Sequence, residues 1–129
     1  MSAGQNGAGT VLLVEDSEPI RAAFTILLED AGYTVLGTGT GREALRLSAE
    51  HRPDLLLLDM GLPDMSGLEV VRQLKAGDAT RDAAVVAVTG RDEDADRQAC
   101  LSAGCADYLV KPVDLQRLLR DLPGYIARR

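Results

Sequence analysis

The chain has 129 residues, the size of one globular domain, and 46% of them are hydrophobic, which is enough to bury a core. The 20 acidic residues outnumber the 14 Lys and Arg and give a net charge of −6, which argues against direct binding of nucleic acid through a basic surface. The longest purely apolar stretch, 83–88, is far too short to cross a bilayer, and no basic-then-apolar leader opens the chain. We therefore expect a cytoplasmic protein without membrane insertion.

Residues 1–9 are small, polar and rich in glycine, so we expect a flexible tail followed by one domain over 10–129. Short apolar runs then alternate with segments of helical periodicity. The runs predict strands at 11–14, 33–36, 54–59, 83–88 and 106–110, and the periodic segments predict helices at 18–31, 42–50, 68–76, 93–103 and 115–122. Pro123 and Gly124 are expected to end the last helix. The lone cysteines, Cys100 and Cys105, are expected to be reduced and structural.

Strict alternation of five strands with five helices predicts an α/β protein. The strand at 54–59 is apolar throughout its interior, which is typical of a parallel sheet with helices on both faces. Right-handed helical crossovers would join the parallel strands into a doubly wound, three-layer sandwich, because a closed barrel of eight units needs about twice as many residues.

Charged or hydroxyl residues follow four of the five predicted strands. Glu15 and Asp16 follow the first strand, and Asp59 ends the third. Thr89 follows the fourth strand and Lys111 the fifth. Ligands of open parallel sheets bind beyond the carboxyl ends of the strands, so these side chains are predicted to share one site.

The charges of this set indicate a cation and a phosphoryl group. Glu15, Asp16 and Asp59 would repel one another unless a cation neutralised them, and carboxylates are the ligands that Mg²⁺ or Mn²⁺ prefers. A divalent ion together with Lys111 brings the local charge to zero. Asp59 is then the candidate nucleophile for an acyl phosphate, with Thr89 as a hydroxyl donor to the phosphoryl oxygens.

Four stretches resemble the receiver domain of bacterial two-component response regulators: Val11 to Asp16, Leu57 to Gly67, Val88 to Gly90, and Asp107 to Pro112. The resemblance covers residues 10–122, with the motifs in the family's order, and is chemotaxis-regulator-like. It implies a flavodoxin-like sandwich with five helices and strand order 2-1-3-4-5. It also implies that Asp59 is the phosphoacceptor.

The resemblance assigns further roles around Asp59. Asp16 would be a direct metal ligand, Glu15 would act largely through water, and the Gly61 carbonyl would complete the protein ligands of Mg²⁺ or Mn²⁺. Lys111 would pair with the phosphoryl oxygens, and the Lys111–Pro112 peptide is expected to be cis.

Two further pairs of residues would control the response. Thr89 and Tyr108 match the switch positions, where the threonine moves toward the phosphoryl group and the aromatic ring turns inward. Gly61 and Arg91 match positions that tune the lifetime of the phosphorylated state.

The function implied is a phosphorelay switch. A phosphohistidine of a sensor histidine kinase or a histidine phosphotransfer domain would donate its phosphoryl group to Asp59. The face formed by the fourth helix, fifth strand and fifth helix would then change shape for a downstream protein target. The domain would catalyse only its own phosphorylation and dephosphorylation, so it is not expected to be an enzyme with an external product.

Three alternatives stay open. The chain could be a free-standing regulator or a receiver taken from a hybrid histidine kinase. Gly37 to Gly41 resembles a phosphate-binding turn of a small nucleotide-binding domain, although Arg42 stands where the dinucleotide motif needs glycine. A hydrolase acting through an aspartyl phosphate would place a second carboxylate where Gly61 stands.

Overall fold

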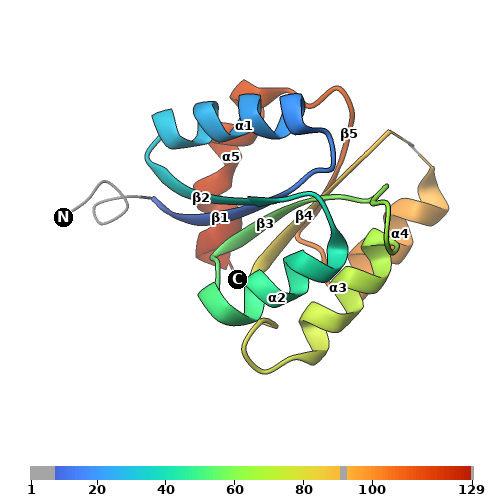
Figure 1. Ribbon diagram of the computed structural model, residues 1–129. Helices are drawn as coiled ribbons and strands as arrows, with labels where there is room; N and C mark the ends of the chain where they lie inside the picture. The colour runs from blue at the N-terminus through green and yellow to red at the C-terminus, as the bar shows by residue number, and fades with distance from the viewer. Residues whose placement is uncertain (1–7, 91–92, 129) are drawn as a thin grey trace.

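The computed structural model describes residues 8–90 and 93–128, and this part of the chain forms a three-layer α/β sandwich (Figure 1). The strands are β1 (Gly9–Val14), β2 (Tyr33–Thr38), β3 (Leu55–Asp59), β4 (Ala84–Thr89) and β5 (Asp107–Val110). The helices are α1 (Glu18–Asp30), α2 (Gly41–His51), α3 (Gly67–Ala76), α4 (Asp94–Ala103) and α5 (Leu115–Arg128). All strand pairs are parallel, in the order β2-β1-β3-β4-β5, as predicted.

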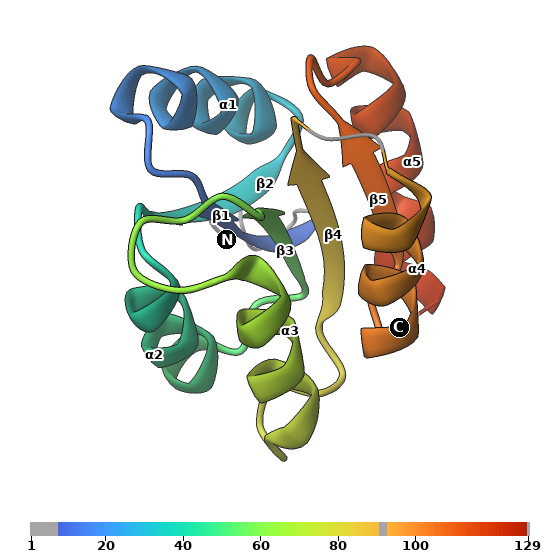
Figure 2. The same ribbon diagram turned by 90° about the vertical axis from the view of Figure 1, so that its right-hand side faces the viewer.

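Successive side chains of the central strands point to opposite faces of the sheet and build two cores. Leu12, Leu56 and Val85 face the layer of α2, α3 and α4. Leu13 and Leu57 face α1 and α5, which cover the other side (Figures 1 and 2). Both faces of β1, β3 and β4 are therefore buried, which explains why their sequences are continuous apolar runs rather than alternating ones.

Side chains just outside the helices satisfy N–H groups that the helices leave without partners. Ser17 Oγ accepts a hydrogen bond from the Ile20 N–H at 3.4 Å and caps α1. Ser66 Oγ caps α3 through the Glu69 N–H at 3.1 Å. These caps fix where the chain turns from each strand end into the following helix.

The ends of the chain differ from the prediction in two respects. β1 already begins at Gly9, the last residue of the predicted tail, while residues 1–7 lie outside the described part. The prediction that Pro123 and Gly124 end the last helix is wrong, because α5 continues to Arg128. Leu118, Leu122 and Tyr125 share one buried face, so packing holds the helix together through the proline.

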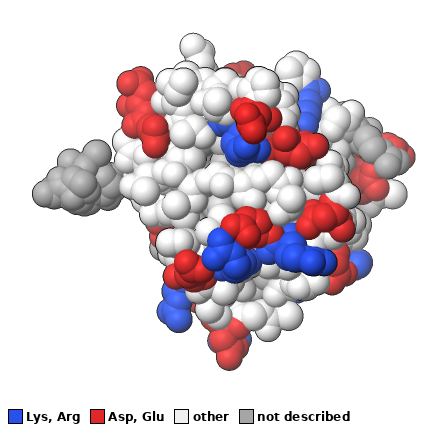
Figure 3. Space-filling view, viewed as in Figure 1, with Lys and Arg blue, Asp and Glu red and all other residues white. Residues whose placement is uncertain are grey.

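The surface mixes both signs of charge. Over α2, Arg46 pairs with Glu43 and Glu50, and blue and red side chains are interspersed there in Figure 3. Within the described residues, no helix combines the length and the hydropathy that crossing a membrane requires.

Candidate functional site at the carboxyl edge of the sheet

The sheet brings the predicted site residues to one edge. Asp59 is the last residue of β3, which lies between β1 and β4. Glu15 and Asp16 leave β1 on one side of it, and Thr89 ends β4 on the other. Lys111 follows β5, where its N–H donates to the Thr89 carbonyl at 2.7 Å and extends the strand pairing by one residue. The Lys111–Pro112 peptide is cis, as predicted.

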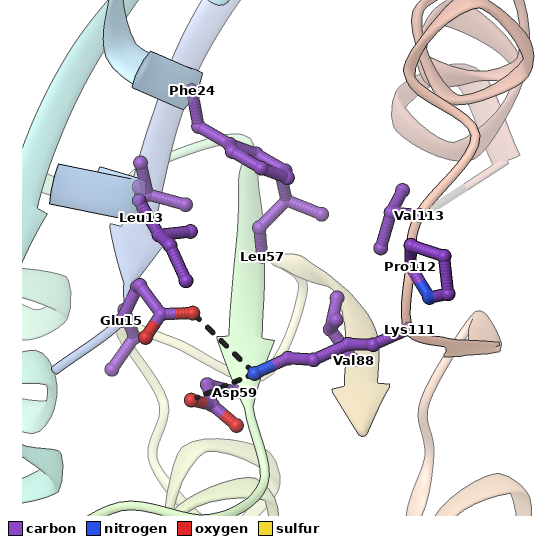
Figure 4. A pocket seen from close by; sticks show the side chains of 11 residues that line it. Leu13, Glu15, Phe24, Leu57, Asp59, Val88, Lys111, Pro112 and Val113 are labelled. Atoms are coloured by element: carbon purple, nitrogen blue, oxygen red, sulfur yellow. Dashed lines mark hydrogen bonds and ion pairs between the residues drawn. The ribbon is translucent and has the colours of Figure 1, made fainter. Parts of the chain in front are cut away.

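The Lys111 ammonium lies between two carboxylates (Figure 4). Its Nζ is 3.4 Å from Asp59 Oδ2 and 3.6 Å from Glu15 Oε1. Both acidic side chains are more than nine-tenths buried, whereas the lysine side chain is 37% exposed. Lys111 therefore reaches in from the rim and gives the buried carboxylates a positive partner.

Glu15, Asp16 and Asp59 form an acidic cluster in which one oxygen from each carboxylate lies within 4.8 Å of the others. Burial raises the pKa of Glu15, the Ser17 N–H opposes this by hydrogen bonding to Glu15 Oε2 at 2.9 Å, and the charge of Asp59 raises the pKa further. The charges of the three carboxylates and of the Lys111 ammonium add up to two negative units. The donor set and its charge fit a divalent, oxygen-preferring cation such as Mg²⁺.

Gly61 folds back toward Asp59. Its N–H donates to Asp59 Oδ1 at 3.0 Å, so the two oxygens of this carboxylate have different partners, a backbone amide and a lysine. A Cβ placed on Gly61 would lie 3.8 Å from Asp59 Oδ1. The absence of a side chain there leaves this side of the Asp59 carboxylate open.

Thr89 and Tyr108, the predicted switch residues, are both buried and line the same cavity, and burial raises the pKa of Tyr108 while the nearby Thr89 side chain lowers it. Arg97 of α4 covers the Tyr108 ring, with its guanidinium carbon 4.9 Å from the ring centroid. Arg97 Nη1 also donates to the Tyr108 carbonyl at 3.3 Å. The Tyr108 ring thus already lies inward and links β4, β5 and α4, whereas Arg91 lies outside the described residues.

An apolar cavity of about 340 Å³ adjoins the carboxylates. Leu13, Phe24, Leu57, Val88 and Val113 form its walls, and Glu15, Asp59 and Lys111 lie at its polar end (Figure 4). The acidic cluster therefore borders a low-dielectric wall, where interactions between charges are stronger than in water.

The glycine-rich turn before α2 holds one of the protein's own carboxylates. Asp64 accepts hydrogen bonds from the N–H groups of Gly41 and Arg42 at 2.8 and 2.9 Å, and Thr40 Oγ1 accepts from the Glu43 N–H at 3.2 Å. The donors that a nucleotide phosphate would need are thus already used, which argues against the nucleotide-binding alternative.

Sequence reasoning missed three residues around the site. Arg97 and Asp64 act across long sequence separations, which no local pattern reports. Arg21 of α1 donates from Nη1 to the Glu15 carbonyl at 2.6 Å, and its side chain packs against Gly37 and Gly39. The only available signal was the glycines themselves, since a Cβ at Gly37 would come within 3.2 Å of Arg21 Cδ.

Comparison with known proteins agrees with this geometry. Residues 11–122 match the family model described as the response regulator receiver domain. The polar-differentiation response regulator DivK of Brucella anthropi is 40% identical over 118 residues, which cover 92% of this chain and 96% of that protein.

Two solved structures are similar in fold and in sequence. The receiver domain of the sensor histidine kinase PA1611 from Pseudomonas aeruginosa has a TM-score of 0.84 and 33% identity over 92% of this chain and 98% of that one, and it holds a magnesium ion in its active-site cleft. The chemotaxis response regulator CheY4 of Vibrio cholerae has a TM-score of 0.83 and 31% identity over 90% and 97% of the two chains.

Proposed function

The chain belongs to the family of response regulator receiver domains, and from this membership we propose that it is a phosphorelay switch whose phosphoacceptor is Asp59. The observation that carries the proposal is the convergence of Asp59, Lys111 and the acidic pair at the end of β3. Asp59 is 8% exposed, which limits the access of water to its carboxylate. One oxygen of this candidate nucleophile also lies beside the positive charge of Lys111.

Asp16, Asp59 and the Gly61 carbonyl would hold Mg²⁺ or Mn²⁺, with Glu15 acting largely through water. When bound, the cation supplies positive charge to the oxygens of the phosphoryl group and of the carboxylates. The acidic cluster supports this ligand set because its remaining charge of two negative units matches a divalent ion.

Transfer would begin with an Asp59 oxygen in line with the P–N bond of a phosphohistidine. The P–O bond to Asp59 forms as the P–N bond breaks, and the imidazole leaves with the electron pair of that bond. Lys111 Nζ, already 3.4 Å from Asp59 Oδ2, would pair with a phosphoryl oxygen as the phosphoryl group moves onto Asp59. The Gly61 N–H at Asp59 Oδ1 restricts rotation of the carboxylate.

The signal would travel through Thr89 and Tyr108. Thr89 and Tyr108 line the same cavity, so movement of the Thr89 hydroxyl toward a phosphoryl oxygen would change the space and the polarity around the tyrosine ring. Because Arg97 ties the Tyr108 ring and carbonyl to α4, this change would alter the face formed by α4, β5 and α5. That face is the proposed contact for a downstream protein target.

The proposed phosphodonor is a sensor histidine kinase or a histidine phosphotransfer domain, and the chain's own chemistry would be limited to self-phosphorylation and autodephosphorylation. Gly61 and Arg91 are proposed to tune the lifetime of the phosphorylated state. A receiver within a hybrid kinase is the second candidate, supported by the likeness to the PA1611 receiver. Both candidates share the same site chemistry.

Incubation of the full chain with acetyl phosphate and Mg²⁺, followed by intact-mass measurement, tests the proposal. The wild type is expected to gain one phosphoryl group, and Asp59→Asn is expected to gain none. Asp78→Asn is the matched control, because Asp78 precedes β4 at the opposite end of the sheet and its side chain is 94% exposed. Labelling that persists in Asp59→Asn would overturn the assignment.

A further inference from the structure

The carboxylate of Asp64 ties the loop between β3 and α3, residues 60–66, to the start of α2. Its Oδ1 accepts from the Gly41 N–H at 2.8 Å and its Oδ2 from the Arg42 N–H at 2.9 Å. These donors belong to the first turn of α2, which lacks intrahelical partners and carries the positive end of the helix dipole. The two bonds hold the pKa of Asp64 below its ordinary value. Asp64 thus joins two elements through charge-assisted hydrogen bonds.

The packing around this junction is equally close. A Cβ placed on Gly41 would lie 2.5 Å from Met65 Cγ and 2.9 Å from Val70 Cγ2, so only glycine lets the loop rest directly on α2. Figure 2 shows the loop passing from the end of β3 to the start of α2 before it enters α3. At its far end, the Gly67 N–H donates to the Met60 carbonyl at 3.3 Å. The path of the loop is therefore fixed at both ends.

The same loop carries Gly61, whose N–H donates to Asp59 Oδ1. Leu62 and Pro63 alone separate Gly61 from Asp64, and the ring of Pro63 fixes one of the few backbone torsions between them. The segment between the two residues is too short and too rigid to absorb a movement of Asp64 away from α2. Such a movement would therefore displace the backbone of Gly61.

We propose that Asp64 is a positioning residue for the cation site: by anchoring the loop to the N-terminus of α2, it holds the Gly61 backbone where the cation needs it. This inference rests on the proposed function, which assigns the Gly61 carbonyl to the cation. It adds to that function a residue that neither touches the acidic cluster nor belongs to the strand-end set.

Thr40 provides the matched comparison. Its Oγ1 caps the same helix through the Glu43 N–H at 3.2 Å, yet Thr40 precedes α2 and is not part of the 60–66 loop. Removing either cap should destabilise α2, but only the loss of Asp64 releases the loop.

The experiment titrates Mg²⁺ into the wild-type full chain and into Asp64→Ala, Asp64→Asn and Thr40→Ala, following backbone amide shifts by NMR, with melting temperatures from circular dichroism. Asp64→Ala is expected to weaken Mg²⁺ binding about fivefold, somewhat less than the loss of a group that contacts a metal ligand directly. Asp64→Asn keeps one acceptor oxygen and should recover part of that affinity. Both alanine variants should lower the melting temperature by about 4 °C, as the loss of a helix cap does, and Thr40→Ala should bind Mg²⁺ like the wild type.

Wild-type affinity in Asp64→Ala, together with a lowered melting temperature, would reduce Asp64 to a helix cap and overturn the inference. An equal loss of affinity in Thr40→Ala would also overturn it, because the effect would then come from α2 rather than from the loop. A wild-type chain without saturable shifts would instead contradict the proposed function, so the two failures are distinguishable.

Discussion

At the level of single residues, the Lys111 ammonium and a divalent cation compete for the carboxylates of the acidic cluster. The ammonium partly neutralises Glu15 and Asp59 before any cation binds. Removing it should leave the carboxylates more negative, which strengthens their attraction for a divalent ion, while depriving a phosphoryl group of a partner. The same side chain therefore opposes binding of the free cation and favours the phosphorylated state.

The Lys111→Met variant keeps a long side chain but loses its charge. It is expected to bind Mg²⁺ about fivefold more tightly, because one nearby positive charge is lost. It should also show a weaker response of the Thr89 and Tyr108 amides to beryllofluoride, a phosphoryl mimic. NMR titration measures both quantities. Arg120→Met is the control, since that side chain is 72% exposed on α5 and pairs with Asp121. Unchanged or weaker Mg²⁺ binding in Lys111→Met would contradict the idea that Lys111 and Mg²⁺ compete for the same carboxylates.

Cys105 shows how burial alone can suppress chemistry. Desolvation, together with a smaller contribution from the neighbouring Cys100, raises the pKa of its thiol to about 12. Because the thiolate is the reactive form, iodoacetamide at pH 8 should modify Cys105 far more slowly in the native chain than in urea. The unfolded thiol ionises first, so the free energy of unfolding should also fall as the pH rises from about 9 to about 12. Fast native alkylation, read by mass spectrometry, would contradict this assignment.

At the scale of elements, α5 shows packing overriding a local signal. Proline lacks an N–H and crowds the preceding turn, which is why a helix end was predicted at Pro123. Tyr125 lies beyond the proline, is 5% exposed, and donates its hydroxyl to Asp107 Oδ2 at the start of β5. Asp107 Oδ1 accepts from the Tyr108 N–H at 2.7 Å, so the last turns of α5 are connected to the strand that carries the proposed switch.

Tyr125→Phe is expected to lower the free energy of unfolding by about 1–2 kcal/mol, because it leaves a carboxylate oxygen of Asp107 without its partner. Urea denaturation followed by circular dichroism measures the change. Tyr33→Phe is the matched control, since Tyr33 is 6% exposed and forms no side-chain hydrogen bond with another described residue. Equal effects of the two substitutions would mean that the Asp107 contact adds nothing to stability.

For the whole molecule, the sequence was sufficient to predict the sheet and the residues that its carboxyl edge collects. Glu15, Asp59 and Lys111 could be placed together because parallel strands end at one edge, a rule that needs no contact map. The anchoring of the loop by Asp64 could not be predicted, because the bond joins residues 23 positions apart and depends on how two loops pack. The stacking of Arg97 on Tyr108 depends in the same way on where α4 lies over β5.

The acidic cluster finally links the site to the stability of the entire fold. An ion that binds only the folded chain stabilises it by mass action, so Mg²⁺ at about 100 times its dissociation constant should add about 2.7 kcal/mol to the free energy of unfolding. The gain should shrink as the pH falls through the raised pKa of Glu15, because a protonated carboxyl no longer attracts the cation. Thermal denaturation with Mg²⁺, with EDTA, and with NaCl at matched ionic strength measures it. Asp16→Asn should abolish the gain and Asp78→Asn should retain it, and stabilisation of equal size by NaCl would mean that the cluster merely senses ionic strength.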